Sequence, residues 1–144
     1  MIFDKQSMFS DAQAITATVA STDIIDLGAP QTPKHGRGPI TQDIGRGNPI
    51  SMRAQVVADF NTLTSLTVTM QVDNDVAFGS PKTVQTTGAI PLVDLKAGKV
   101  LALEYIPRGT DERYMRLLYT VAGTNPTLGK VTAGLVFGNE AWSA

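Results

Sequence analysis

Ser65-Leu66-Thr67-Val68-Thr69-Met70-Gln71-Val72 alternates apolar and polar side chains along its whole length. Successive side chains of a strand point to opposite faces of a sheet, so the apolar set from Leu66 to Val72 falls on one face and the polar set from Thr67 to Gln71 on the other. This stretch therefore predicts a strand with one face in a core and the other face toward solvent.

Similar patterns elsewhere predict about eight strands in all. The alternation recurs in residues 15–19 and in residues 130–135, where it continues to Phe137. Residues 100–106 and 114–121 are nearly continuous apolar runs, interrupted by Glu104 and Arg116, and such runs predict strands buried on both faces. Weaker patterns predict three more strands, at residues 24–27, 50–58 and 82–86.

Turn chemistry separates the predicted strands. Gly, Pro, Asn and Asp cluster in the connections, as in Gly79-Ser80-Pro81 and Gly123-Thr124-Asn125-Pro126. Short strands separated by such turn residues indicate an all-β fold, and eight strands fit an antiparallel jelly-roll sandwich. An immunoglobulin-like sandwich is the nearest alternative, although its usual cysteine pair is absent. Residues 4–14 could form one or two helical turns.

Length and composition limit the folds and functions that this chain can have. At 144 residues we expect one domain, residues 1–144, with enough chain for a single core. The absence of cysteine excludes a disulfide framework, a thiolate nucleophile and a zinc–thiolate site. The formal net charge of −1 argues against a dedicated nucleic-acid binder. Neither a signal-peptide layout nor a membrane-spanning apolar run is present, so we expect a protein used without secretion and without a membrane partner.

The sequence contains no complete motif for catalysis, cofactor binding or metal binding. His35 is the single histidine, and no neighbouring group would orient it as a general base, so we expect an ordinary loop histidine. Glu104 lies in an apolar run, and together with a second carboxylate it could hydrolyse a glycoside. Pairing with Arg116 or exposure to solvent is the simpler interpretation. The Asp73-Asn74-Asp75 run lacks the later residues of a calcium loop. We therefore expect no enzyme, no cofactor and no metal site.

Residues 28–49 have no strand or helix period, and they contain two similar phrases. Gly36-Arg37-Gly38-Pro39-Ile40 is followed by Gly45-Arg46-Gly47-Asn48-Pro49-Ile50. Unstructured connections of this length in compact domains are usually functional or disordered. Arg-Gly repeats that bind nucleic acid are normally numerous and interleaved with aromatic residues, which are missing here. The phrases therefore favour a loop that docks on a protein partner, with Arg37 and Arg46 as donors to carboxylates or carbonyls.

A family resemblance adds to this reading. The opening segment, residues 3–16, is joined in order by Val72-Asp73-Asn74-Asp75-Val76-Ala77-Phe78-Gly79-Ser80-Pro81, by Tyr105-Ile106-Pro107-Arg108-Gly109-Thr110 and by Tyr119-Thr120-Val121-Ala122-Gly123-Thr124. In this order the phrases resemble the small capsid cement (decoration) proteins of tailed bacteriophages, the family typified by a Bordetella phage. The resemblance extends over nearly the whole chain.

The resemblance implies a jelly-roll subunit on the outer surface of a virion. Its implied partner is the major capsid protein, whose neighbouring capsomers it would bridge, and it would self-associate as a dimer, with a trimer as the alternative. A second hypothesis is a carbohydrate-binding or host-surface-binding jelly roll, which would need exposed aromatic side chains. From the residues alone we expect contact elements in residues 1–14 and 28–49, with five candidate interface residues: Phe3, Phe9, Arg37, Arg46 and Trp142.

Overall fold

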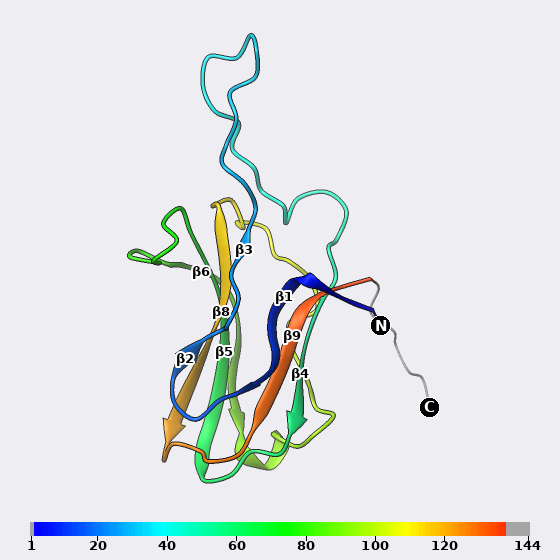
Figure 1. Ribbon diagram of the computed structural model, residues 1–144, viewed down its shortest axis with the longest axis vertical. Coiled ribbons are helices and arrows are strands. Elements are labelled where there is room, and N and C mark those ends of the chain that lie inside the picture. Colours follow the sequence, from blue (N-terminus) through cyan, green and yellow to red (C-terminus); the bar gives the residue numbers. More distant parts are fainter. Residues whose placement is uncertain (1, 138–144) are drawn as a thin grey trace.

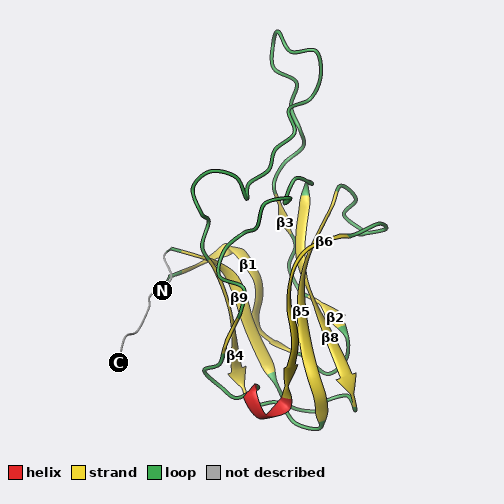
Figure 2. Ribbon diagram, turned by 180° about the vertical axis from the view of Figure 1, so that it is seen from behind, coloured by secondary structure: helices red, strands yellow, loops and turns green. Residues whose placement is uncertain are grey.

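A computed structural model describes residues 2–137 of the chain, and these residues form two antiparallel sheets packed face to face (Figure 1). One sheet has the strand order β1 (Phe3–Ala14), β9 (Lys130–Val136), β4 (Met52–Ala58) and β7 (Val100–Leu101). The other has the order β2 (Val19–Ala20), β8 (Tyr114–Gly123), β5 (Leu63–Asp73) and β6 (Lys82–Pro91), and β3 (Ile25–Asp26) also pairs with β8. A single 3-10 turn, η1 (Leu92–Asp94), closes one end of the sandwich (Figure 2).

The strand pairing is nested, which is the pattern of a jelly roll. β2 and β3 are two short pieces beside the same strand β8, so they occupy one position. The first strand position then pairs with the last (β1 with β9), the second with the seventh (β2 and β3 with β8), the third with the sixth (β4 with β7) and the fourth with the fifth (β5 with β6). The predicted all-β jelly-roll sandwich of about eight strands is confirmed.

β5 is central to its sheet and supplies the middle of the core. Its apolar set Leu66, Val68, Met70 and Val72 is fully buried, as the alternation predicts. These side chains belong to one cluster with the inward residues of the opposite sheet, among them Met52 and Val131. Burying apolar surface between two sheets is the main force that holds such a sandwich together.

The N-terminal segment differs from its prediction. Residues 4–14 are not helical: they lie within β1, which pairs with β9. Three register shifts interrupt this pairing, and Ala12 has a φ of 47°. Such bulges insert extra residues and break the period-2 pattern, which is why the sequence did not read as a strand. The expectation that residues 1–14 project from the body is wrong for β1, because this strand is paired at the edge of a sheet, whereas a contact role for it stays a prediction.

Three predicted strands are reduced to two-residue pieces: the one at residues 15–19 to β2, the one at 24–27 to β3 and the one at 100–106 to β7. Residues 15–18 form a bend where the chain crosses from one sheet to the other, and only Val19 continues as β2. Of residues 100–106, only Val100 and Leu101 are in β7; beyond them the Leu103 amide turns back to the Leu101 carbonyl at 2.8 Å. The segment is not buried on both faces, since Glu104 is exposed.

β8 forms as predicted, but its two faces differ. Met115, Leu117 and Tyr119 are fully buried, whereas Arg116 on the other face is half-buried. The Arg116 guanidinium lies 4.1 Å from the centre of the Phe78 ring, which the 74–81 connection places over this face. A cation–π contact with Phe78 thus accommodates Arg116 in the apolar run. The outer face of β8 is only partly covered.

Candidate functional site

The most distinctive surface feature is an arm formed by residues 28–42, which extends from one end of the sandwich (Figure 1). Every residue from Gly28 to Gln42 is exposed, and none is in a strand or helix. One backbone hydrogen bond joins the two sides of the arm, from the Ile40 amide to the Gln31 carbonyl at 3.0 Å. Pro30, Pro33 and Pro39 restrict the backbone, because the proline ring fixes φ. The arm therefore adds reach without adding core.

The tip of the arm carries positive charge. The Gly36 amide donates to the Pro33 carbonyl at 2.8 Å, which closes a turn with Lys34 and His35 at its two central positions. Arg37 follows directly. Residues 28–42 contain Lys34 and Arg37 and no acidic residue, so the arm has a charge of +2 with His35 neutral. A surface of this kind favours a partner that offers carboxylates or carbonyl oxygens.

Residues 43–46 anchor the arm to the body. The Asp43 Oδ2 atom accepts a hydrogen bond from the Gly109 amide at 2.9 Å, and its Oδ1 accepts one from the Gly45 amide at 2.9 Å. Ile44 donates its amide to the Thr110 carbonyl at 3.3 Å and packs its side chain against the core. Gly45 lies so close to Pro107 that a Cβ at this position would overlap the Pro107 carbonyl. This close approach requires glycine.

The electrostatics of Asp43 agree with this anchoring role. The Gly109 amide, followed by the Gly45 amide and the Arg46 guanidinium, lowers the pKa of the Asp43 carboxyl below its ordinary value. Hydrogen bonds to a carboxylate favour its charged form, so the anchor persists throughout the neutral range. Lys82 also holds the loop that contains Gly109: its Nζ atom donates to the Gly109 carbonyl at 3.0 Å and to Asp111 Oδ1 at 2.9 Å.

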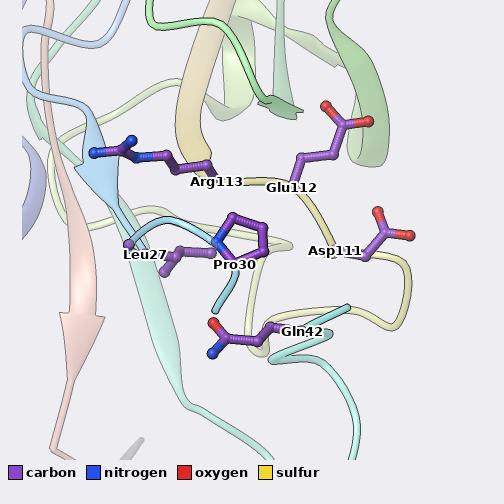
Figure 3. A pocket seen from close by; sticks show the side chains of 7 residues that line it. Leu27, Pro30, Gln42, Asp111, Glu112 and Arg113 are labelled. Atoms are coloured by element: carbon purple, nitrogen blue, oxygen red, sulfur yellow. The ribbon is translucent and has the colours of Figure 1, made fainter. Parts of the chain in front are cut away.

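A small crevice marks the base of the arm. Figure 3 shows Pro30 between Leu27 and Gln42, with the 111–113 segment alongside. The crevice holds about 10 Å³, which is about the space that one water molecule requires. Arg113, which also lines the crevice, donates two hydrogen bonds of 2.9 Å each to the Asp26 carboxylate. This crevice therefore offers no room for a small-molecule ligand.

The structure separates the two candidate arginines. Arg37 is exposed on the arm, whereas Arg46 belongs to the anchor, where its Nε lies 3.4 Å from Asp43 Oδ2. The two Gly-Arg-Gly phrases therefore play different parts, although the sequence predicts one docking loop for both. Arg46 is still largely exposed, with 77% of its side chain accessible.

The three aromatic candidates also differ. Phe3 is half-buried on β1. Phe9 is fully buried in the core, so its prediction as an interface residue is wrong: the bulged strand turns this side chain inward. Trp142 lies outside the described residues. Sequence reasoning missed Asp43 and Thr110 as organising residues. An Asp two residues before a Gly was a signal for the local Asp43–Gly45 bond, but nothing in the sequence indicated Gly109 as the second partner.

Neither a metal-binding cluster nor a membrane helix appears in residues 2–137. No group of three His, Cys, Asp or Glu side chains in this range could hold a metal ion. No helix in the same range combines the length and apolar character needed to cross a bilayer. His35 is exposed near the tip of the arm, apart from the acidic residues of the body.

Together, the nested strand pairing and the anchored arm define a jelly-roll protein with a projecting basic loop. The chain matches the Bbp16 family over residues 9–135 and belongs to that family, whose name suggests a Bordetella phage protein. Among curated proteins, no sequence matches this chain.

Proposed function

We propose that this protein is a capsid cement protein of a tailed bacteriophage. It binds the outer surface of the major capsid shell and bridges neighbouring capsomers, and it performs no catalysis. Membership of the Bbp16 family, with its phage-derived name, is compatible with a virion protein. The observation that carries the proposal is the arm: fully exposed, basic at its tip and fixed at its base by Asp43.

In this proposal the partner of the arm is an acidic or carbonyl-rich patch on the major capsid protein. Lys34 and Arg37 supply donors, and the flanking glycines permit close approach of the backbone. An arm held at its base loses less conformational entropy on docking than a free loop would. Many such contacts on one shell add up through multivalency, so each can be weak.

Bridging requires more than one contact surface. We propose that copies of the protein associate with one another, as dimers in the first instance and as trimers in the alternative, so that arms from one assembly reach different capsomers. The near-neutral net charge of −1 allows many copies to crowd on a shell without strong repulsion.

The test is reconstitution on capsids that lack the protein. Wild type and the Arg37→Ala variant are added at equal concentration, and occupancy and resistance of the capsids to heat are measured. We expect Arg37→Ala to lower both. Lys96→Ala is the matched control, because Lys96 is an exposed cation two residues after η1, and η1 lies at the end of the sandwich opposite the arm (Figure 2). Equal occupancy of wild type and Arg37→Ala would remove the arm from the proposal, and absence of binding by wild type would overturn it.

A further inference from the structure

A second surface feature lies away from the arm, along the open side of the sandwich. A hollow of about 330 Å³ separates β6, the edge strand of one sheet, from the segment that follows β7, the edge strand of the other. Its lining comes from both sides: Gln85, Ala102, Glu104, Tyr105, Ile106 and Pro107. Small-molecule sites commonly have volumes of roughly 300–1,000 Å³, so the hollow is large enough for one sugar-sized ligand.

Tyr105 is the most accessible tyrosine of the chain. Tyr119 is fully buried, and the ring of Tyr114 lies under the Arg113 guanidinium at 4.8 Å. Tyr105, in contrast, is 47% exposed and lines the hollow. Its backbone is fixed by a bridge to Ser51 and by the neighbouring hydrogen bond from the Ile106 amide to the Ile50 carbonyl at 3.0 Å. An aromatic ring is thus presented on a held backbone.

Gln85 supplies an unsatisfied polar atom beside this ring. It pairs with Met70 in the β5–β6 ladder, and Met70 points into the core, so Gln85 points toward the interior side of the sheet edge. Its Oε1 atom is buried and has no hydrogen-bond partner in the described chain. Buried polar atoms are nearly always paired, so this acceptor, on a residue that lines the hollow, lacks a donor. A hydroxyl group is the donor that fits, since it can rotate to suit the acceptor.

We propose that this hollow binds a neutral sugar residue of a glycan. The apolar face of the sugar ring stacks on Tyr105, and the Gln85 amide turns toward the hollow so that a sugar hydroxyl donates to its oxygen. Glu104 places a carboxylate at the wall, and the lining contains no cation, which disfavours acidic or phosphorylated sugars. The jelly roll is also the architecture of many lectin domains, although this is analogy at the level of the fold alone.

The test uses the purified full-length protein without capsids. A glycan array identifies neutral ligands, and titration calorimetry with the best monosaccharide measures affinity for wild type, Tyr105→Ala and Gln85→Leu. We expect binding by wild type and a loss of affinity of about tenfold or more in both variants, as for removal of a principal contact. Phe137→Ala and Gln42→Leu are matched controls, because both residues are exposed and lie outside the hollow, and they should bind as wild type does.

Three results would overturn the proposal. The first is an array without neutral glycan hits, and the second is equal affinity of wild type and Tyr105→Ala. The third is a Gln85→Leu variant that binds the glycan as tightly as wild type does, which would show that the Gln85 amide oxygen accepts no sugar hydroxyl. Because no capsid is present, each of these outcomes leaves the cement proposal untouched, and failure of capsid binding leaves this one untouched.

Discussion

The Asp43 carboxylate and the Gly109 amide, 66 residues apart in the sequence, are joined by a hydrogen bond of 2.9 Å that fixes the base of the arm. The same carboxylate binds the Gly45 amide, so one side chain connects the end of the arm to the turn before β8. This connection divides the loop of residues 28–49 into an exposed arm and an anchored base.

Asp43→Ala should release the base of the arm while the sandwich stays folded. We expect faster hydrogen exchange of the Gly109 and Gly45 amides, because both lose the oxygen that protects them. Amide exchange followed by NMR measures this directly. Asp94→Ala, which removes an exposed carboxylate on η1, is the control and should leave both amides unchanged. Unaltered exchange in Asp43→Ala would show that the turn holds itself without Asp43.

The two Gly-Arg-Gly phrases should respond differently to alanine. Gly45→Ala places a Cβ against the Pro107 carbonyl and should reduce the free energy of unfolding by about 1–3 kcal/mol, as overpacking does. Gly38→Ala has no atom within 4 Å of the new Cβ, so its stability should stay within about 0.5 kcal/mol of wild type. Urea unfolding compares the two. Similar losses for both variants would contradict the assignment of the second phrase to the anchor.

A buried hydrogen-bond chain connects the two sheets at Tyr119. The Ser10 hydroxyl donates to the Gln13 side-chain oxygen at 2.7 Å, so the Tyr119 hydroxyl is the donor to Ser10 Oγ, also at 2.7 Å. Tyr119→Phe should cost about 1 kcal/mol of unfolding free energy, the usual net value of one such bond. Denaturant unfolding measures the loss. Tyr105→Phe is the control on an accessible tyrosine, and an equal loss there would argue against a special role for the Tyr119 bond.

The same burial predicts an alkaline transition. Burial raises the pKa of the Tyr119 hydroxyl above its ordinary value of 10.0. A group whose pKa is raised in the folded state stabilises the fold below its unfolded pKa, and this contribution is lost as the pH rises above about 10. Absorbance titration should therefore show one of the three tyrosines resisting ionisation until the protein unfolds. Simultaneous ionisation of all three in the folded protein would contradict the expected burial.

At the acid end, Asp26 should titrate well below an ordinary aspartate. Its two hydrogen bonds from Arg113, together with the Gly28 amide, lower the pKa of Asp26 from 3.8 to about 2. A lowered pKa means that the stabilisation is present above the unfolded pKa and is lost as the pH falls from about 4 toward 2. NMR titration of the Asp26 carboxyl measures this, and Arg113→Gln should return its midpoint toward 3.8. A midpoint unaffected by Arg113→Gln would assign the shift to another cause.

Much of the fold was predictable because strand periodicity is a local property. The alternation from Leu66 to Val72 named four buried residues of β5, and the turn residues located most strand ends. The predictions failed where the backbone departs from a regular strand: at the bulges of β1, at the bend of residues 15–18 and after Leu101. In β1 the bulges change the number of residues per pleat, and at the other two places the chain leaves the sheet, so the pattern no longer indicates which face a side chain takes.

The sequence by itself determined the class of fold, the identity of most core residues and the existence of a long loop with two arginine phrases. Only the tertiary structure decided that Arg37 lies on an exposed arm, that Gly45 is pressed against Pro107, and that Phe9 faces the core. The physical reason is the range of the interactions. Alternation of side chains is set by neighbouring residues, whereas the anchor at Asp43 depends on a turn 66 residues further along the chain, beyond the strands from β4 to β7.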